Sequence, residues 1–425
     1  MDPAVTALII LAVIIVLYVT EVIPLALTSV AGCIAMALFG IIEFPEAFGG
    51  FSANVVFLVG GMMFVGNALF ETGGAEAIGN RIKAMGHSNE KHILLIIMLV
   101  CGVLSAFISN SATTAMFISI IFGMAASSGG ALDSRRLLMP LAFSANSGGM
   151  LTLVGSTPPV IVQGVLTDAG HAPLSFFEFA LIGAPVFAFV ILYMMTVGYR
   201  QMRKLSEEKK EEMERQVSEA AAAYENGNKD TSKMKLTFAI LGLCIVLFAT
   251  EAIPTHLTSV IGAWLVIVTG CLKFKQAFKS FDWNTIIVLA GSLGIARGIE
   301  LSGAAEMIAN SILNVGFADQ PIVILGIFIA VGMIFTQIVS NTAATAMMAP
   351  IGLFLAQGMG VSPYPLMLGL CTLTAAGFTT PVATPPNTMV LVGGYSFRDY
   401  IRIGGVLNLL VLIIVTLLAP MIWPF

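Results

Sequence analysis

The chain has 425 residues, of which 57% are hydrophobic and only 10% are charged, and its mean hydropathy is +0.95. Soluble globular domains carry about 25% charged residues, so the composition excludes a soluble domain. The net charge of -4 gives no indication of a nucleic-acid partner, and none is expected. Long unbroken apolar runs exclude a β-barrel, whose segments of about ten residues alternate in polarity. The sequence therefore predicts an all-α polytopic membrane protein.

Apolar runs close to the length that crosses a bilayer, about 20 residues, occur along the whole chain. In the first half we expect membrane spans at about 4–20, 24–42, 53–71, 136–168 and 176–199. In the second half we expect them at about 236–250, 254–272, 284–302, 364–393 and 402–423. Two further apolar stretches, 92–128 and 322–356, each carry a polar motif near the centre. The paired segments 71–86 and 300–316 have the pattern of amphipathic interfacial helices.

The two halves of the chain resemble each other. TEVIPLALTSVAG, which begins at Thr20, matches TEAIPTHLTSVIG, which begins at Thr250, at nine of thirteen positions. The polar motif ISNSATTAM, which begins at Ile108, returns as VSNTAATAM, which begins at Val339. GSTPP, which begins at Gly155, is matched by VATPP, which begins at Val382. Three collinear matches at nearly one offset predict an internal repeat, with one copy in 1–199 and the other in 236–425.

A charged segment, 200–235, separates the two copies, and we expect it to form a solvated cytoplasmic helix and loop. If the linker is cytoplasmic, the predicted spans place all other Lys and Arg residues except Arg297 on the same side, as the positive-inside rule requires. Both termini then lie outside. Because each half has five spans, an odd number, the second half crosses the membrane in the opposite sense. The sequence thus predicts an inverted-topology repeat, an architecture of secondary transporters.

The stretches 92–128 and 322–356 each return the chain to the side from which it entered, either as two full crossings or as one re-entrant hairpin. The arms 92–107 and 112–127 have 16 residues each, which as helix is about 24 Å against a hydrocarbon core of about 30 Å. Length therefore favours two re-entrant helical hairpins with their tips inside the membrane.

Two spans are interrupted by residues that break helices. The first break contains Gly148, Gly149 and Gly155, and the second lies in TAAGFTTPVATPPNT. We expect Thr157 and Thr384, each followed by two prolines, to be N-caps with proline at the first helical position. Two broken helices and two hairpin tips bring four helix N-termini to the midplane, where no Lys, Arg or His is present in the motifs. Such a site attracts an anion through helix dipoles, amides and hydroxyls.

Burying a dianion in an uncharged site is costly, and bound cations would offset that cost. Backbone carbonyls at broken helices, together with Ser and Asn oxygens, suit a hard cation. Neither polar motif contains a carboxylate, so a divalent metal is disfavoured and Na⁺ is the expected coupling ion. No organic cofactor is expected.

The paired Ser-Asn-Ser/Thr motifs, each followed by a Thr-Pro-Pro break, resemble the divalent anion/sodium symporter family, whose members carry di- and tricarboxylates. The resemblance covers nearly the whole chain. The first motif departs from the family's usual Ser-Asn-Thr because residue 111 is Ser. The Asn that follows the second Thr-Pro-Pro is present as Asn387, whereas Val160 stands at that place in the first half.

The resemblance implies a substrate site and two sodium sites. The expected substrate ligands are Asn110, Ser111, Ser156, Thr157, Asn341, Thr342, Thr384 and Pro385. The first sodium is expected among Ser105, Ser109, Asn110 and Gly155, and the second among Thr336, Val339, Asn341 and Ala383. Thr336 and Ser105 hold the same position in the repeat, each a short distance before the motif serine.

The resemblance also implies an elevator-type carrier, in which a transport domain slides against a dimeric scaffold, so a homodimer in the cell membrane, in contact with lipid, is expected. The leading function is Na⁺-coupled symport of C4-dicarboxylates such as succinate, malate and fumarate. The alternatives are Na⁺-independent exchange of dicarboxylates, a proton-coupled carrier of the same fold, and a channel. An enzyme is not expected, because the sequence has no HExxH motif, no paired Asp and no Ser–His pairing.

Overall fold

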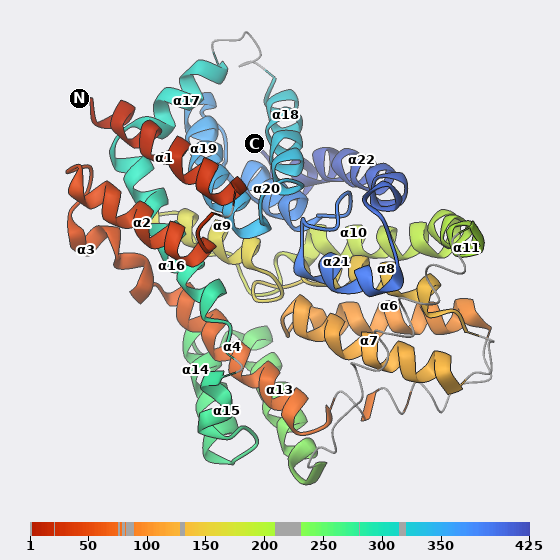
Figure 1. Cartoon of the computed structure of the whole chain (residues 1–425). Helices are drawn as coiled ribbons and strands as arrows, with labels where there is room; N and C mark the ends of the chain where they lie inside the picture. The colour runs from red at the N-terminus through yellow and green to blue at the C-terminus, as the bar shows by residue number, and fades with distance from the viewer. Residues whose placement is uncertain are drawn as a thin grey trace.

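The computed structural model describes residues 2–20, 22–74, 77–78, 81, 89–127, 132–208, 231–279, 281–313 and 320–425. Every regular element within these residues is a helix (Figure 1). Six of the helices are long and apolar enough to cross a membrane, and they run over Asn54–Glu71, Ala180–Glu207, Thr231–Thr250, Trp283–Leu301, Asn341–Met359 and Phe397–Ile422. The prediction of an all-helical polytopic membrane protein is confirmed.

Helices occur at the predicted spans of the first half, with small shifts at their ends. Together with the short α3, the two hairpin arms and the start of the linker, the helices of this half are α1 (Pro3–Thr20), α2 (Leu25–Leu38), α3 (Phe44–Ala47), α4 (Asn54–Glu71), α6 (Glu90–Ser105), α7 (Asn110–Ser127), α8 (Ser134–Gly148), α9 (Thr157–Asp168), α10 (Ala180–Tyr193) and α11 (Tyr199–Glu208). One π-helical turn, Met194–Gly198, joins α10 to α11. The start of the charged linker therefore continues a membrane helix, and residues 209–230 of the linker lie outside the described residues.

The second half has helices at corresponding places. They are α13 (Met234–Thr250), α14 (Thr255–Val268), α15 (Phe274–Lys279), α16 (Trp283–Leu301), α17 (Ala304–Leu313), α18 (Pro321–Thr336), α19 (Asn341–Met359), α20 (Tyr364–Ala375), α21 (Pro385–Met389) and α22 (Phe397–Ile422). The last helix begins at Phe397, earlier than the predicted 402, because Ser396 and Asp399 form a capping box at its start. The interfacial helix expected at 300–316 is α17, and most of its expected partner at 71–86 lies outside the described residues.

The two Ser-Asn motifs lie in tight turns, one between α6 and α7 and one between α18 and α19. The serine caps the following helix in both, since Ala112 N donates to Ser109 Oγ (3.2 Å) and Ala343 N donates to Ser340 Oγ (3.3 Å). Each cap starts the helix at the asparagine itself. As a result α7 has 18 residues, longer than the 16 predicted for this arm, whereas α6 has the predicted 16. In the second hairpin the two arms, α18 and α19, have 16 and 19 residues.

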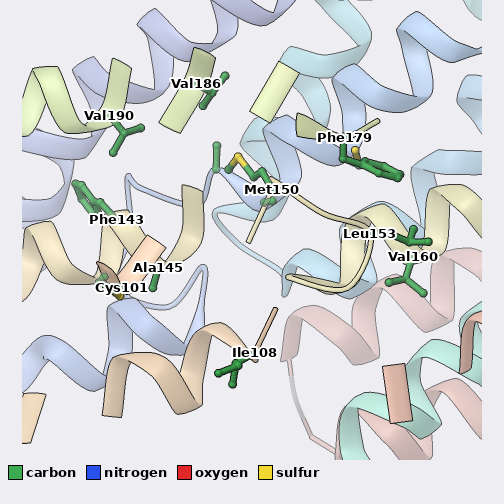
Figure 2. Close-up of a cluster of buried hydrophobic side chains, with 14 of the residues drawn as sticks. Cys101, Ile108, Phe143, Ala145, Met150, Leu153, Val160, Phe179, Val186 and Val190 are labelled. Atoms are coloured by element: carbon green, nitrogen blue, oxygen red, sulfur yellow. The ribbon is translucent and has the colours of Figure 1, made fainter. Parts of the chain in front are cut away.

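The first broken span unwinds between α8 and α9, over residues 149–156. A Cβ on Gly148 would lie 2.2 Å from the carbonyl oxygen of Gly102, so the glycine is needed for close approach to α6. None of the three glycines of this break, Gly148, Gly149 and Gly155, has the left-handed backbone that glycine often provides. Met150 and Leu153 of the unwound segment lie among buried apolar side chains that include Phe179 (Figure 2). Close packing, rather than an unusual backbone angle, explains these glycines.

The second broken span unwinds between α20 and α21, over residues 376–384. Asn387 Nδ2 donates to the carbonyl oxygens of Gly377 (2.6 Å) and Thr380 (2.8 Å), two backbone groups that have left the helix. Gln337, in the turn after α18, accepts from Thr379 N at 3.1 Å. One buried amide and one neighbouring turn therefore satisfy backbone groups that lipid could not.

Helices of the two halves pack against each other in matched pairs. In Figure 1, α4 lies beside α14, and α2 lies beside α16. A Cβ on Gly61 would lie 2.5 Å from the backbone of Ser259, and one on Gly291 would lie 2.6 Å from Ser29 Cβ. Gly61 and Gly291 hold equivalent positions in the two copies of the repeat, and so do Ser29 and Ser259. Small residues thus allow both helix pairs to approach closely, which is typical of helix contacts in membranes.

We expect Gly61→Ala to lower the melting temperature of the detergent-solubilised protein by several degrees. The added methyl overlaps the Ser259 backbone, and overpacking of this kind costs about 1–3 kcal/mol. Gly242→Ala on α13 is the matched control, because no described atom outside the backbone of its own helix turn lies within 4 Å of the added Cβ. Equal melting temperatures for the two variants would contradict the packing described for α4 and α14.

Candidate functional site

A cavity of about 220 Å³ lies where α7, α19, α9 and α21 begin. Residues of both polar motifs and both Thr-Pro-Pro breaks line it. The sequence-predicted residues among them are Ser109, Asn110, Ser111, Gly155, Ser156, Thr157, Asn341, Thr342, Ala383, Thr384 and Pro385. Segments from both copies of the repeat, far apart in the sequence, therefore share one site.

Asn110 lies within a cluster of oxygen atoms at the first tip. Ser105 Oγ lies 2.5 Å from the Asn110 amide and donates to the carbonyl oxygen of Ala145 at 2.9 Å. In its better-paired orientation the amide nitrogen of Asn110 donates to Ser105 Oγ and to the carbonyls of Ala145 (3.2 Å) and Gly155 (2.9 Å). A Cβ on Gly149 would lie 2.5 Å from Asn110 Oδ1, so the unwound segment packs directly on this amide. The first hairpin tip and the first break are therefore in direct contact through Asn110.

Asn341 has nearly the same surroundings at the second tip. Thr336 Oγ1 lies 2.8 Å from Asn341 Oδ1 and 2.9 Å from the carbonyl oxygen of Thr374, and its one hydrogen can be donated to either. Ser105 lies in the same way between the Asn110 amide and the Ala145 carbonyl. Thr345 Oγ1 donates to the carbonyl oxygen of Asn341 at 2.7 Å. The side chains of Ser105 and Thr336 are fully buried behind the cavity wall. They hold the two motif asparagines without lining the cavity themselves.

The cavity wall contains almost no charge. Among the described lining residues Asp282 alone is ionisable, and it caps α16 by accepting from Thr285 N (3.1 Å) and Thr285 Oγ1 (2.5 Å). The N–H groups of Asn110 and Ser111, and of Asn341 and Thr342, are in first helical turns and have no acceptor within their helices. An anion in the cavity would therefore meet uncharged donors.

The two Thr-Pro-Pro breaks differ in how the helix restarts. Thr384 is the N-cap of α21 as predicted, and its Oγ1 accepts from Asn387 N at 3.4 Å. The prediction for Thr157 is wrong, because Ser156 is the N-cap of α9 and Thr157 is its first helical residue. Ser156 Oγ donates instead to the carbonyl oxygen of Gly149 (3.0 Å), within the unwound segment. Proline has no N–H, so these two helix starts offer fewer donors than the hairpin tips.

Not every expected sodium ligand lines the cavity. Val339 is 2% exposed and lies in the apolar cluster around α1 and α17, so only its backbone carbonyl could serve a cation. The structure also places Asn146, Asn284 and Thr285 on the cavity wall, and none of these residues was predicted to be part of the site. For Asn146 the sequence did hold a signal, an amide just before the glycines that mark the first break.

Comparison with known proteins places the chain among transporters. A family model described as "Citrate transporter" matches residues 15–370. The sodium-dependent dicarboxylate transporter SdcS of Staphylococcus saprophyticus is 24% identical, over 96% of this chain and 84% of its own. The sodium-dependent high-affinity dicarboxylate transporter 3 of Caenorhabditis elegans is 25% identical, over 94% of this chain and 80% of its own.

Among solved structures, the YdaH transporter of Alcanivorax borkumensis has a similar fold, with a TM-score of 0.59 at 13% identity. The similarity covers 90% of this chain and 89% of that one. The resemblance to divalent anion/sodium symporters is confirmed. The matching family is a family of transporters and not of enzymes. The chain belongs to the citrate transporter family and is a secondary transporter with several membrane-spanning helices.

Proposed function

We propose that the protein is a Na⁺-coupled symporter of C4-dicarboxylates. The observation that carries the proposal is a cavity with no basic side chain among its described lining residues and with two matched clusters, each built from a motif asparagine, a hydroxyl and backbone carbonyls. The relatives named as sodium-dependent dicarboxylate transporters support it.

The donor set at each tip fits a sodium ion. At the first tip the amide of Asn110 faces three oxygens, those of Ser105, Ala145 and Gly155. With the amide nitrogen turned toward them, hydrogen bonds satisfy all three. With Oδ1 turned toward them, the single hydroxyl hydrogen of Ser105 cannot satisfy Oδ1 and both carbonyls, and a monovalent cation among these oxygens would offset the repulsion that remains. We propose that Na⁺ binding selects this second orientation and presents the amide N–H₂ to the substrate.

The second sodium site would use the oxygens of Thr336 and Asn341 and the carbonyls of Val339 and Ala383. Thr336 is well placed for this, because it is buried and already contacts Asn341 and the Thr374 carbonyl. A sodium ion at each tip would bring a full positive charge to a cavity whose wall lacks one. That charge offsets the cost of taking a dianion out of water, so substrate and sodium would each strengthen binding of the other.

The dicarboxylate would lie between the two tips. Asn110 and Ser111 would donate to it from one side, and Asn341 and Thr342 from the other. Thr384 Oγ1 accepts from Asn146 Nδ2 (2.9 Å) and from Asn387 N (3.4 Å), so its own hydrogen is left to point elsewhere. We assign that hydrogen to a substrate carboxylate, with Ser156, Thr157 and Pro385 completing the wall.

A second cavity supports transport by alternating access. It has a volume of about 500 Å³, and the central cavity and this one are lined by adjacent residues, Val154 and Leu153. Asn54, Val55, Leu58 and Thr255 line the second cavity, whereas their equivalents in the other copy of the repeat, Asn284, Thr285, Val288 and Leu25, line the central one. Equivalent parts of the two halves thus line two neighbouring openings.

We infer that these cavities are vestibules on opposite faces of the membrane, in an inverted repeat of 1–199 and 236–425 with hairpins re-entering at 92–128 and 322–356. The hairpins and broken spans would move as an elevator against α1–α4 and α13–α16 of a homodimeric scaffold. The linker 200–235 would lie in the cytoplasm and both termini outside. In that orientation Leu25 and Asp282 lie toward the cytoplasm, so the described state opens inward.

Purified protein in liposomes should accumulate labelled succinate when an inward Na⁺ gradient is imposed, and should not do so with K⁺ in its place. Asn110→Ala and Asn341→Ala should each reduce this uptake to the level of empty liposomes while leaving the size-exclusion profile unchanged, because each removes an amide at one tip. Uptake that does not depend on the Na⁺ gradient but requires dicarboxylate inside the liposomes would contradict symport and indicate exchange. Near-normal uptake by either variant would contradict the site.

Thr336→Val should raise the Na⁺ concentration for half-maximal uptake about tenfold. The substitution keeps the shape of the side chain but removes a hydroxyl that contacts Asn341, and the loss of one such interaction costs about 1–1.5 kcal/mol. Thr416→Val is the matched control, since among the described residues Thr416 Oγ1 bonds only the carbonyl of Leu412 in its own helix. An unchanged Na⁺ dependence for Thr336→Val would rule out the second sodium site at this position.

A further inference from the structure

Asn146 is a buried amide on the wall of the central cavity. It lies near the end of α8, is 1% exposed, and lines the cavity that also contains both motif asparagines. Its side chain links the two halves, because Nδ2 donates to Thr384 Oγ1 (2.9 Å) and to Asn387 Oδ1 (3.1 Å).

The orientation of this amide is fixed by its neighbours. Asn387 Nδ2 is committed to the backbone carbonyls of Gly377 and Thr380, so Asn387 Oδ1 must face the other way. An oxygen there requires a donor, which makes the group of Asn146 that faces it the Nδ2. A flip of Asn146 would place two oxygens against each other. Asn146 Oδ1 is therefore an acceptor in a fixed place, and it has no hydrogen-bond partner in the described part of the chain.

An unpartnered buried acceptor is costly, and it repels a carboxylate, which at neutral pH also offers only acceptors. A ligand carrying an O–H group next to its carboxylate satisfies both neighbours at this corner. The carboxylate would take the hydrogen of Thr384 Oγ1, and the ligand hydroxyl would donate to Asn146 Oδ1. The positions equivalent to Asn146 in the second copy of the repeat are Ala375 and Ala376, which have no side-chain acceptor. A side-chain acceptor equivalent to Asn146 Oδ1 would therefore face one end of the substrate only.

We propose that Asn146 is a specificity-determining residue that accepts a hydrogen bond from the substrate, and that the preferred substrate is a 2-hydroxydicarboxylate such as malate. This inference rests on the proposed dicarboxylate transport and narrows it. Because the acceptor is fixed and one-sided, the site distinguishes the two enantiomers of malate. A site built to hydrogen-bond a substrate hydroxyl discriminates strongly against an analogue that lacks it.

Competition in proteoliposomes tests the proposal. A Na⁺ gradient drives uptake of labelled succinate, and the concentrations of unlabelled succinate, L-malate and D-malate that halve this uptake are compared. For the wild type one malate enantiomer should inhibit at about one tenth of the succinate concentration, since one added hydrogen bond to a buried acceptor corresponds to about a tenfold change. In Asn146→Ala, the half-inhibitory concentrations of that enantiomer and of succinate should become nearly equal, so that their ratio is close to one.

Asn408→Ala is the matched control. Asn408 on α22 is equally buried, its amide atoms have no partner in the described residues, and it does not line the cavity, so its loss should leave the ratio unchanged. The wild type alone can overturn the proposal if neither enantiomer inhibits better than succinate. The proposal would also be overturned if Asn146→Ala kept the wild-type ratio of half-inhibitory concentrations and needed more Na⁺ for both substrates. That result would indicate that Asn146 Oδ1 binds a cation and not the substrate hydroxyl.

Failure of the proposed Na⁺-coupled dicarboxylate transport can be distinguished from failure of the role of Asn146. If no dicarboxylate supports Na⁺-dependent uptake, the proposed function fails and this inference fails with it. If succinate is transported but the hydroxyl is not recognised, the function stands and only the role of Asn146 is wrong.

Discussion

A backbone that leaves its helix inside a membrane must find hydrogen-bond partners within the protein, because lipid offers none. The region around the central cavity follows from this constraint. At the second break, the amide of Asn387 supplies partners for two carbonyls of the unwound segment. At the first break, glycines let the backbone lie against Asn110 and Gly102. The groups that satisfy the two unwound segments are thus the groups that line or support the site.

The same arrangement determines the electrostatics of the site. The cavity wall offers amides, hydroxyls and first-turn N–H groups, and within the described residues it includes no basic side chain. A permanent positive charge would hold a dicarboxylate tightly even without a coupling ion. A wall without a basic side chain, with oxygen clusters behind it, would make anion binding depend on cations that arrive with the substrate. In the proposed function this dependence is what couples transport to the sodium gradient.

Much of the fold and of the candidate site could be predicted from the sequence, because the chain repeats itself. One polar motif inside an apolar helix is ambiguous, but the second copy around Asn341 and the matched Thr-Pro-Pro breaks placed four helix starts together. Local spacing could not show that α9 begins at Thr157 with Ser156 as its N-cap, because Ser156 makes no side-chain capping bond and its hydroxyl bonds the Gly149 carbonyl of the unwound segment instead. The role of Asn146 was equally hidden, since its partner Asn387 lies in the other half of the chain.

In the proposed function, sodium ions and a dicarboxylate occupy one site that has no basic side chain among its described residues, and they bind cooperatively. Isothermal titration calorimetry of the purified protein with succinate, at a series of Na⁺ concentrations and with ionic strength held constant by choline chloride, tests it most directly. Succinate affinity should rise steeply with Na⁺, and Na⁺ affinity should rise by the same factor when succinate is present, as linkage requires. Succinate binding of equal strength in choline and in sodium would rule out cooperative binding of sodium and substrate.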